Sequence, residues 1–213
     1  MTASQDNQSA TTADSPHRQE SAPTPAGNPL LDVAYIAVFA ALIIALAFVA
    51  IPVGAAGVPI VLQNAAVILA GLILGRTRGF LTALLFLGLG LIGLPVLAGG
   101  KTTLAALGGP TIGYLVGYLV SATVAGSIAY LAPRGNRKAL TIYLALGAIA
   151  ALACQYLCGL VGMMFRADMS FGQALAVNVP FLIPDLIKAA CAVAIASGVH
   201  LSLPDIRRKA FLK

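Results

Sequence analysis

Two charged side chains, Asp185 and Lys188, stand out because they lie within a long apolar stretch of the sequence. A charge at the middle of a hydrocarbon layer costs roughly 2.5–3.5 kcal/mol, so such residues need a structural or functional reason. Their spacing of three places both on one face of a helix. Lys188 offers a cation for a carboxylate and Asp185 offers an acceptor for N–H donors, which would suit a small polar ligand. The alternative is that the two charges only neutralise each other, with Asp185 also capping its helix.

The prolines near this pair predict where its helix begins. Pro180 and Pro184 are expected at the outer end of a helix over Phe181–Leu203, because proline suits the first turn of a helix. Asp185 and Lys188 would then lie in the first turns, where the helix dipole and unpaired N–H groups favour an anion.

Uncharged polar residues and one glycine-rich segment add further candidates. Gln63, Asn64 and Tyr114 are expected near the outer ends of two other helices, where they would line a cavity or anchor the chain at the membrane interface. The GGKT segment around Lys101 is reminiscent of a phosphate-binding loop. Such a loop requires a glycine five positions before Gly100, where this chain has Pro95, so hydrolysis of ATP would need another subunit.

The remainder of the sequence is typical of an integral membrane protein. Of its 213 residues, 59% are hydrophobic and only 9% are charged, which excludes a soluble amphipathic bundle and a nucleic-acid-binding protein. Residues 1–28 lack large apolar side chains and predict a disordered tail, followed by a six-helix unit at 29–203 and a basic tail at 204–213. We therefore predict an all-α membrane protein, a six-transmembrane-helix bundle, with spans at Leu30–Ala50, Pro59–Gly75, Gly79–Leu94, Thr111–Leu131, Ala139–Met164 and Phe181–Leu203.

The basic residues predict the orientation of these spans. Lys101 and Arg166 lie in the gaps on one side. Nine basic residues fall on the other side: Arg76, Arg78, Arg134, Arg137, Lys138, Arg207, Arg208, Lys209 and Lys213. The positive-inside rule then places both termini in the cytoplasm.

Hydrolytic or metal-dependent chemistry finds no suitable residues in the apolar part of the chain. The sole glutamate, Glu20, and His17 lie in the N-terminal tail, while His200 stands alone near the inner end of the last span and is expected at the interface. The three cysteines lie in apolar segments without a CxxC pair and are expected to pack. No catalytic residue, cofactor or metal site is predicted.

Small residues recur at four-residue spacing on two of the expected helices. Gly113 and Gly117 are interpreted as close-packing positions inside the bundle. Ala37 and Ala41 have two interpretations: packing inside the bundle or an outward surface that contacts a partner helix.

Five short segments, in this order and spacing, carry a resemblance to a known family. They are Val58–Gln63 (VPIVLQ), Ala70–Gly75 (AGLILG), Gly93–Gly100 (GLPVLAGG), Gly109–Leu115 (GPTIGYL) and Pro184–Ala189 (PDLIKA). With them the chain resembles the BioY family, the biotin-specific S components of energy-coupling factor (ECF) transporters. The GGKT continuation and Ile112, where the family more often has a second glycine, depart from the pattern.

This resemblance implies a six-helix S component in a bacterial plasma membrane that captures biotin from outside. It also implies partners, a transmembrane T component and two ABC ATPases, with Ala37 and Ala41 facing the T component, although some members are thought to act alone. The segment Ile51–Val58 would be a lid over the site. The expected substrate-binding residues are Asp185, Lys188, Gln63, Gly99, Gly100, Lys101, Thr111 and Tyr114.

Biotin is chemically complementary to such a site, because it combines a carboxylate with a ureido ring that has two N–H donors. Lys188 is expected to bind the carboxylate and Asp185 the N–H groups. Other hypotheses are an S component for a different carboxylated vitamin, a small intramembrane enzyme, and a structural or assembly subunit.

Overall fold

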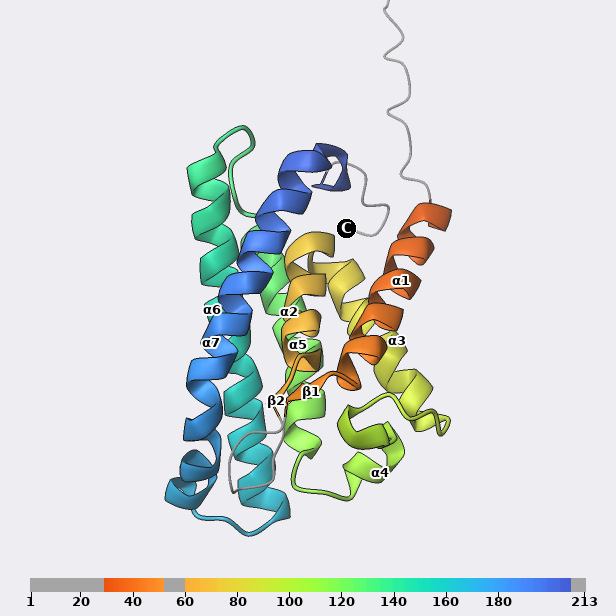
Figure 1. The fold of residues 1–213 in the computed structure, drawn as a ribbon, viewed down its shortest axis with the longest axis vertical. Coiled ribbons are helices and arrows are strands. Elements are labelled where there is room, and N and C mark those ends of the chain that lie inside the picture. The colour runs from red at the N-terminus through yellow and green to blue at the C-terminus, as the bar shows by residue number, and fades with distance from the viewer. Residues whose placement is uncertain (1–28, 52–59, 208–213) are drawn as a thin grey trace, which may run out of the picture.

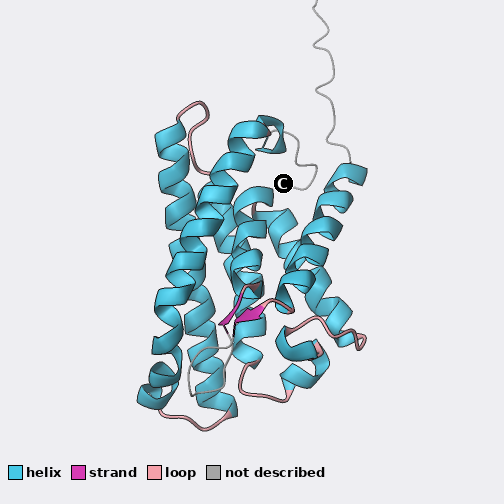
Figure 2. Cartoon of the chain, viewed as in Figure 1, coloured by secondary structure: helices cyan, strands magenta, loops and turns pink. Residues whose placement is uncertain are grey.

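The computed structural model describes residues 29–51 and 60–207, and within them the chain is almost entirely helical (Figures 1 and 2). The elements are α1 (Pro29–Ala47), β1 (Ala50–Ile51), β2 (Ile60–Val61), α2 (Gln63–Leu74), α3 (Arg76–Leu91), the 3₁₀ turn η1 (Ala98–Gly100), α4 (Thr103–Leu107), α5 (Ile112–Ala129), α6 (Arg137–Arg166), α7 (Phe171–Ser202) and the 3₁₀ turn η2 (Pro204–Arg207). The all-α prediction is confirmed. The tail predicted at 1–28 and the basic tail beyond Arg207 lie outside the described residues.

Each predicted span corresponds to one helix, and these helices are α1, α2, α3, α5, α6 and α7. Four of them, α1, α5, α6 and α7, are long and apolar enough to cross a membrane. With 12 and 16 residues, α2 and α3 are shorter than the roughly 20 residues that a full crossing needs. The two short helices are consecutive, and Gly75, with a φ of 86°, turns the chain between them.

The last helix begins much earlier than the sequence predicted. α7 starts at Phe171 and not at Phe181, because Ser170 and Gln173 form a capping box. The hydroxyl of Ser170 accepts from the backbone N–H of Gln173 at 3.3 Å, and the Gln173 side chain accepts from the backbone N–H of Ser170 at 2.9 Å. Two of the four backbone N–H groups that lack intrahelical partners at the start of α7 are therefore satisfied before either proline occurs.

Pro180 and Pro184 lie inside α7, which contradicts their predicted place at its end. Membrane helices tolerate internal prolines where neighbouring groups compensate for the lost backbone hydrogen bonds. Asp185 and Lys188 consequently lie in the body of the helix, and the explanation that a helix N-terminus favours an anion at Asp185 is wrong.

Alanine and larger aliphatic side chains fill the inside of the bundle, and large apolar side chains also cover its outside. Val38, Leu157 and Ile183 are 64%, 61% and 71% exposed, a distribution that suits a lipid environment. Between α5 and α6 a Cβ atom added at Gly113 would clash with the carbonyl oxygen of Cys158, so the predicted packing role of Gly113 is confirmed.

Two arginines, one buried and one half-buried, hold the end of the bundle where α1 and α6 begin and α7 finishes (Figure 1). Arg78, which the sequence placed among the charges that set orientation, is buried, and its Nε lies 3.0 Å from Oδ1 of Asp32 on α1. Arg207 in η2 donates to the carbonyl oxygens of Ala129, Tyr130 and Ala132 where α5 ends, at 3.4, 3.3 and 2.8 Å. The packed part of the chain thus continues past the last helix to Arg207.

His200 is buried as well, so its predicted interfacial position is wrong. Its Nε2 lies 2.9 Å from the carbonyl oxygen of Leu72, in the last turn of α2. The last four carbonyl groups of a helix lack intrahelical partners, and His200 supplies one.

Candidate ligand-binding site

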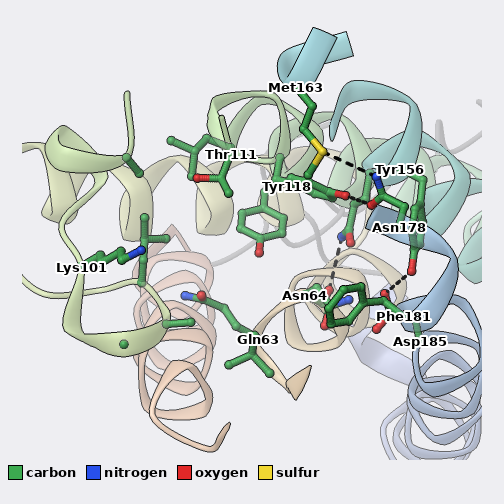
Figure 3. A pocket seen from close by; sticks show the side chains of 18 of the residues that line it. Gln63, Asn64, Lys101, Thr111, Tyr118, Tyr156, Met163, Asn178, Phe181 and Asp185 are labelled. Atoms are coloured by element: carbon green, nitrogen blue, oxygen red, sulfur yellow. Dashed lines mark hydrogen bonds between the residues drawn. The ribbon is translucent and has the colours of Figure 1, made fainter. Parts of the chain in front are cut away.

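A cavity of about 520 Å³ opens at the other end of the bundle, among α2, α4, α5, α6, α7 and the segment around η1 (Figure 3). This volume is within the range of small-molecule sites. Its polar lining residues are Gln63, Asn64, Lys101, Thr111, Tyr114, Tyr118, Gln155, Tyr156, Asn178, Asp185 and Lys188, and the others are Val61, Leu97, Ala98, Gly99, Ala106, Leu115, Met163, Val177 and Phe181. β1 pairs antiparallel with β2 near this end; most of the predicted lid segment between them lies outside the described residues.

The Asp185–Lys188 pair is the polar centre of one side of this cavity. Lys188 Nζ lies 2.5 Å from Asp185 Oδ1. The same ammonium donates to the carbonyl oxygen of Val61 at 2.7 Å and to Oδ1 of Asn64 at 2.9 Å. The hydroxyl of Tyr156 on α6 donates to Asp185 Oδ2 at 2.7 Å. These contacts join α7 to α2 and α6.

The hydrogen-bond inventory of this cluster decides which groups remain for a ligand. An ammonium has three N–H donors, and Lys188 uses them on three acceptors. A carboxylate has about four acceptor positions, and only two of those of Asp185 are occupied. The amide nitrogen of Asn64 donates no hydrogen bond to any described residue. The cluster therefore offers Asp185 as an acceptor and Asn64 as a donor.

Tyr114 and Asn178 form a second polar contact on the wall between α5 and α7. The Tyr114 hydroxyl donates to Oδ1 of Asn178, whose Nδ2 donates to the carbonyl oxygen of Ala174 at 2.7 Å. Gly159 on α6 makes room for this arrangement, because a Cβ atom there would clash with the Tyr114 ring. The phenol is thus fixed by packing on one side and by an amide on the other.

The glycine segment forms the opposite side of the cavity. Gln63 Nε2 donates to the carbonyl oxygen of Val96 at 2.7 Å and so ties α2 to this segment. Leu97 and Lys101 pair with each other across η1. Lys101 is exposed, forms no ion pair with a described residue, and lies across the cavity from Asp185 (Figure 3).

The structure brings seven of the eight predicted substrate-binding residues into the cavity wall and leaves out Gly100. Sequence reasoning missed Tyr156, Asn178 and Phe181 as lining residues. A helix that starts at Phe171 would have revealed two of them, since positions 178, 181 and 185 recur at helical spacing on one face.

Ala37 and Ala41 are exposed on the outer face of α1 and make no contribution to the cavity lining. Within residues 29–51 and 60–207, no group of three or more His, Cys, Asp or Glu side chains is placed to hold a metal ion.

A membrane bundle with a cavity of this size, lined by charged, polar and apolar side chains, has the features of the class of small-molecule-binding membrane proteins. Comparison with known proteins gives the family. The model of the BioY family matches residues 17–205. The chain belongs to the BioY family.

Named relatives agree with this assignment. The biotin transporter BioY of Rhodobacter capsulatus is 42% identical over 168 residues, which is 74% of this chain and 86% of that protein. The biotin transporter BioY of Rhizobium etli is 34% identical over 187 residues, covering 84% and 98% of the two chains. A crystal structure of the S component for biotin from an ECF-type ABC transporter matches with a TM-score of 0.70 and 31% identity, over 81% of this chain and 92% of that one. The predicted S-component fold is confirmed.

Proposed function

We propose that this chain is a biotin-binding S component that serves biotin uptake across a bacterial plasma membrane. Membership of the BioY family makes it a transporter subunit rather than an enzyme. The observation that carries the choice of ligand is the buried Asp185 carboxylate, which is held by Tyr156 and Lys188 and retains free acceptor positions at one side of the cavity.

The ureido ring of biotin fits that side. Its two N–H groups donate to the free acceptor positions of Asp185, and the amide nitrogen of Asn64 donates to the ureido oxygen. The ring sulfur and the aliphatic chain then lie against apolar side chains such as Leu115, Val177 and Phe181, which also line the cavity.

The carboxylate of biotin is assigned to Lys101 on the opposite side. Lys188 was the first candidate from the sequence, but its three donors are already used within the protein. Lys101 supplies a cation that has no ion-pair partner among the described residues, and an extended ligand anchored at Asp185 directs its far end toward it (Figure 3). The wall around the aliphatic chain of biotin is completed by Gln63, Gly99, Thr111 and Tyr114.

Equilibrium binding to the detergent-purified protein tests this assignment. Biotin is compared with lipoate, which has the same carboxylated aliphatic chain but no ureido group, and with other carboxylated vitamins such as pantothenate and nicotinate. Biotin is expected to bind and the others are not. Preferential binding of another vitamin would contradict the biotin assignment and would support the alternative hypothesis, an S component for a different carboxylated vitamin.

The proposed partners are a T component and two ABC ATPases, with contact through the exposed Ala37 and Ala41 on α1. Replacing both alanines with tryptophan is expected to abolish co-purification with a T component while biotin binding persists. Ile142→Trp, at an exposed position of α6, is the matched control. Loss of biotin binding in the Ala37/Ala41 variant would assign these residues to internal packing instead.

Both termini are proposed to lie in the cytoplasm, because basic residues of the loops gather at the end of the bundle away from the cavity. Single cysteines introduced at Gly135 and Lys101, in a variant without the native cysteines, are expected to react from the inside and the outside, respectively. The reverse pattern would invert the bundle and move the cavity to the wrong side.

A further inference from the structure

A second cavity, of about 260 Å³, lies at the end of the bundle where α6 begins and α7 finishes, away from the biotin cavity. It is lined by Pro133, Arg134, Gly135, Asn136, Arg137, Leu140, His200, Leu201 and Arg207. Three guanidinium groups and an imidazole therefore surround a small space, and its described lining contains no carboxylate. Such a space is suited to an anion.

His200 gives independent support for a ligand in this cavity. His200 is only 5% exposed, and its Nε2 is hydrogen-bonded to the carbonyl oxygen of Leu72. Nδ1 is buried and has no hydrogen-bond partner among the described residues. Buried polar atoms almost always have partners, so Nδ1 is an unsatisfied group on a residue that lines the cavity.

A phosphodiester headgroup that carries hydroxyl groups offers a partner to either state of the imidazole. Because Nε2–H donates to the carbonyl oxygen of Leu72, Nδ1 of a neutral ring is an acceptor, which a headgroup hydroxyl can satisfy. Nδ1–H of the imidazolium instead donates to an ionised phosphate oxygen. A chloride ion or a simple carboxylate would satisfy only the second case.

The start of α6 adds to the positive field. This helix is 30 residues long, and Asn136 caps it by accepting from the N–H of Ala139 at 3.0 Å. Its first turn, which begins at Arg137, carries the positive end of the helix dipole. On the other side, burial lowers the pKa of Arg207; Tyr130 opposes this change and Arg134 adds to it, so two like charges approach one another there.

The surroundings of the cavity match a lipid rather than a soluble anion. Leu131, Leu201 and Leu203, in the same segments that line the cavity, are 69%, 47% and 52% exposed. Aliphatic side chains beside a cationic space provide a surface for acyl chains and a receptor for a headgroup. We infer that this cavity binds the headgroup phosphate of an anionic phospholipid, with Arg134, Arg137, Arg207 and His200 around it.

The test uses the full chain in detergent micelles that contain increasing fractions of phosphatidylglycerol, with thermal unfolding as the readout. Phosphatidylglycerol is expected to raise Tm, whereas phosphatidylcholine and inorganic phosphate are not. In the Arg134→Gln/Arg137→Gln variant, the lipid fraction that gives half of the effect should rise at least about tenfold, because two charge-assisted contacts are lost. An Arg76→Gln/Lys138→Gln variant removes the same charge at exposed positions outside the cavity and should respond like the native protein.

Biotin binding, measured on the same samples, should be equal in all variants, which shows that they are folded. Equal responses to phosphatidylglycerol in the two double variants would overturn the proposal, because the effect would then be nonspecific attraction. A response to inorganic phosphate alone would assign the site to a soluble anion. Binding of polyglutamate that depends on Arg134 and Arg137, without a lipid effect, would assign it to an acidic protein partner, and either result would overturn the lipid assignment.

Discussion

Two buried ion pairs among the described residues have the same chemistry but different surroundings. Asp32 and Arg78 join α1 to α3 at 3.0 Å, their side chains are 3% and 2% exposed, and neither lines the two cavities described above. Asp185 and Lys188 lie on one helix at 2.5 Å, are 9% and 10% exposed, and line the larger cavity. The first pair is sealed within protein and the second forms part of a wall.

The two pairs differ in position and not in charge, because one is sealed between helices and the other faces a cavity. Asp32 and Arg78 are far apart in sequence, so their contact fixes one helix against another, and Arg78 adds a contact with the Tyr35 ring, 5.9 Å from its centroid. A pair at i, i+3 fixes only its own helix. What ties Asp185 and Lys188 to the rest of the fold is a set of hydrogen bonds to groups that also face the cavity.

Breaking the sealed pair should give the largest effect, and it should fall on stability. Arg78→Met leaves Asp32 buried without its cation, and removal of one partner from a buried pair costs roughly 3–5 kcal/mol. The Asp32→Leu/Arg78→Met double variant should recover most of this loss, because it buries no unpaired charge. Thermal unfolding in detergent measures the effect. The biotin Kd of the folded variants should be unchanged, and a weakened Kd with native stability would contradict the structural assignment.

Breaking the cavity pair should affect ligand affinity. Asp185→Asn replaces the charged acceptor for the ureido N–H groups with a neutral amide, and Lys188→Met releases Asn64 and Asp185 from their positions. Charge-assisted hydrogen bonds contribute roughly 1.5–3 kcal/mol, so each change should weaken biotin binding about ten- to a hundredfold in an equilibrium titration.

The Asp185→Leu/Lys188→Met double variant distinguishes the two kinds of pair. Like the double variant of the sealed pair, it should recover stability, because both charges are gone. Biotin binding should remain lost. If binding returned in full, the pair would serve only to neutralise charge in the membrane, and Asp185 would not contact the ligand.

The sequence was sufficient to predict the helical membrane fold, because composition and the length of apolar runs decide that class directly. It also indicated Asp185 and Lys188 as candidate site residues, because two charges in an apolar run are conspicuous, and the structure places both in the cavity wall. The predicted start of α7 was wrong because it rested on Pro180 and Pro184 and not on the Ser170 capping box. Asn178 precedes that predicted start, so it was missed as a lining residue. Local signals compete at such boundaries, and tertiary packing decides between them.

The sealed pair could not be recognised from sequence, because nothing local connects Asp32 to Arg78. Basic residues next to an apolar segment usually set orientation, and Arg78 fitted that pattern. Likewise, the sequence could not reveal that Lys188 is saturated, because two of its acceptors, Val61 and Asn64, lie on a distant segment. Both features depend on long-range partners, which only the three-dimensional packing supplies.

A smaller effect is expected at the far side of the cavity. Lys101→Ala should weaken biotin binding about tenfold, which is at the lower end for a charge-assisted contact because Lys101 is exposed. Biotin amide should bind the native protein more weakly than biotin and lose little more in this variant. Arg166→Ala, an exposed cation at the same end that lies outside the cavity wall, is the control. The native protein should bind biotin more tightly than biotin amide. If Lys188→Met abolished this difference in affinity and Lys101→Ala did not, the biotin carboxylate would be assigned to Lys188 instead.

The smallest effect concerns the hydroxyl that orients Asp185. Tyr156→Phe removes the hydrogen bond to Asp185 Oδ2 but keeps the ring and both charges, so the pair survives with one contact fewer. A single hydrogen bond contributes roughly 0.5–1.5 kcal/mol, and biotin affinity should fall about two- to tenfold by isothermal titration. Tyr118→Phe is the matched control, since Tyr118 lines the same cavity and its hydroxyl makes no hydrogen bond to a described residue. Because the hydroxyl is expected to act only by orienting the Asp185 carboxylate, the effect of Tyr156→Phe on biotin affinity should vanish in the Asp185→Asn background. A Tyr156→Phe loss of the same size in that background would mean that the hydroxyl contacts the ligand itself rather than positioning the carboxylate.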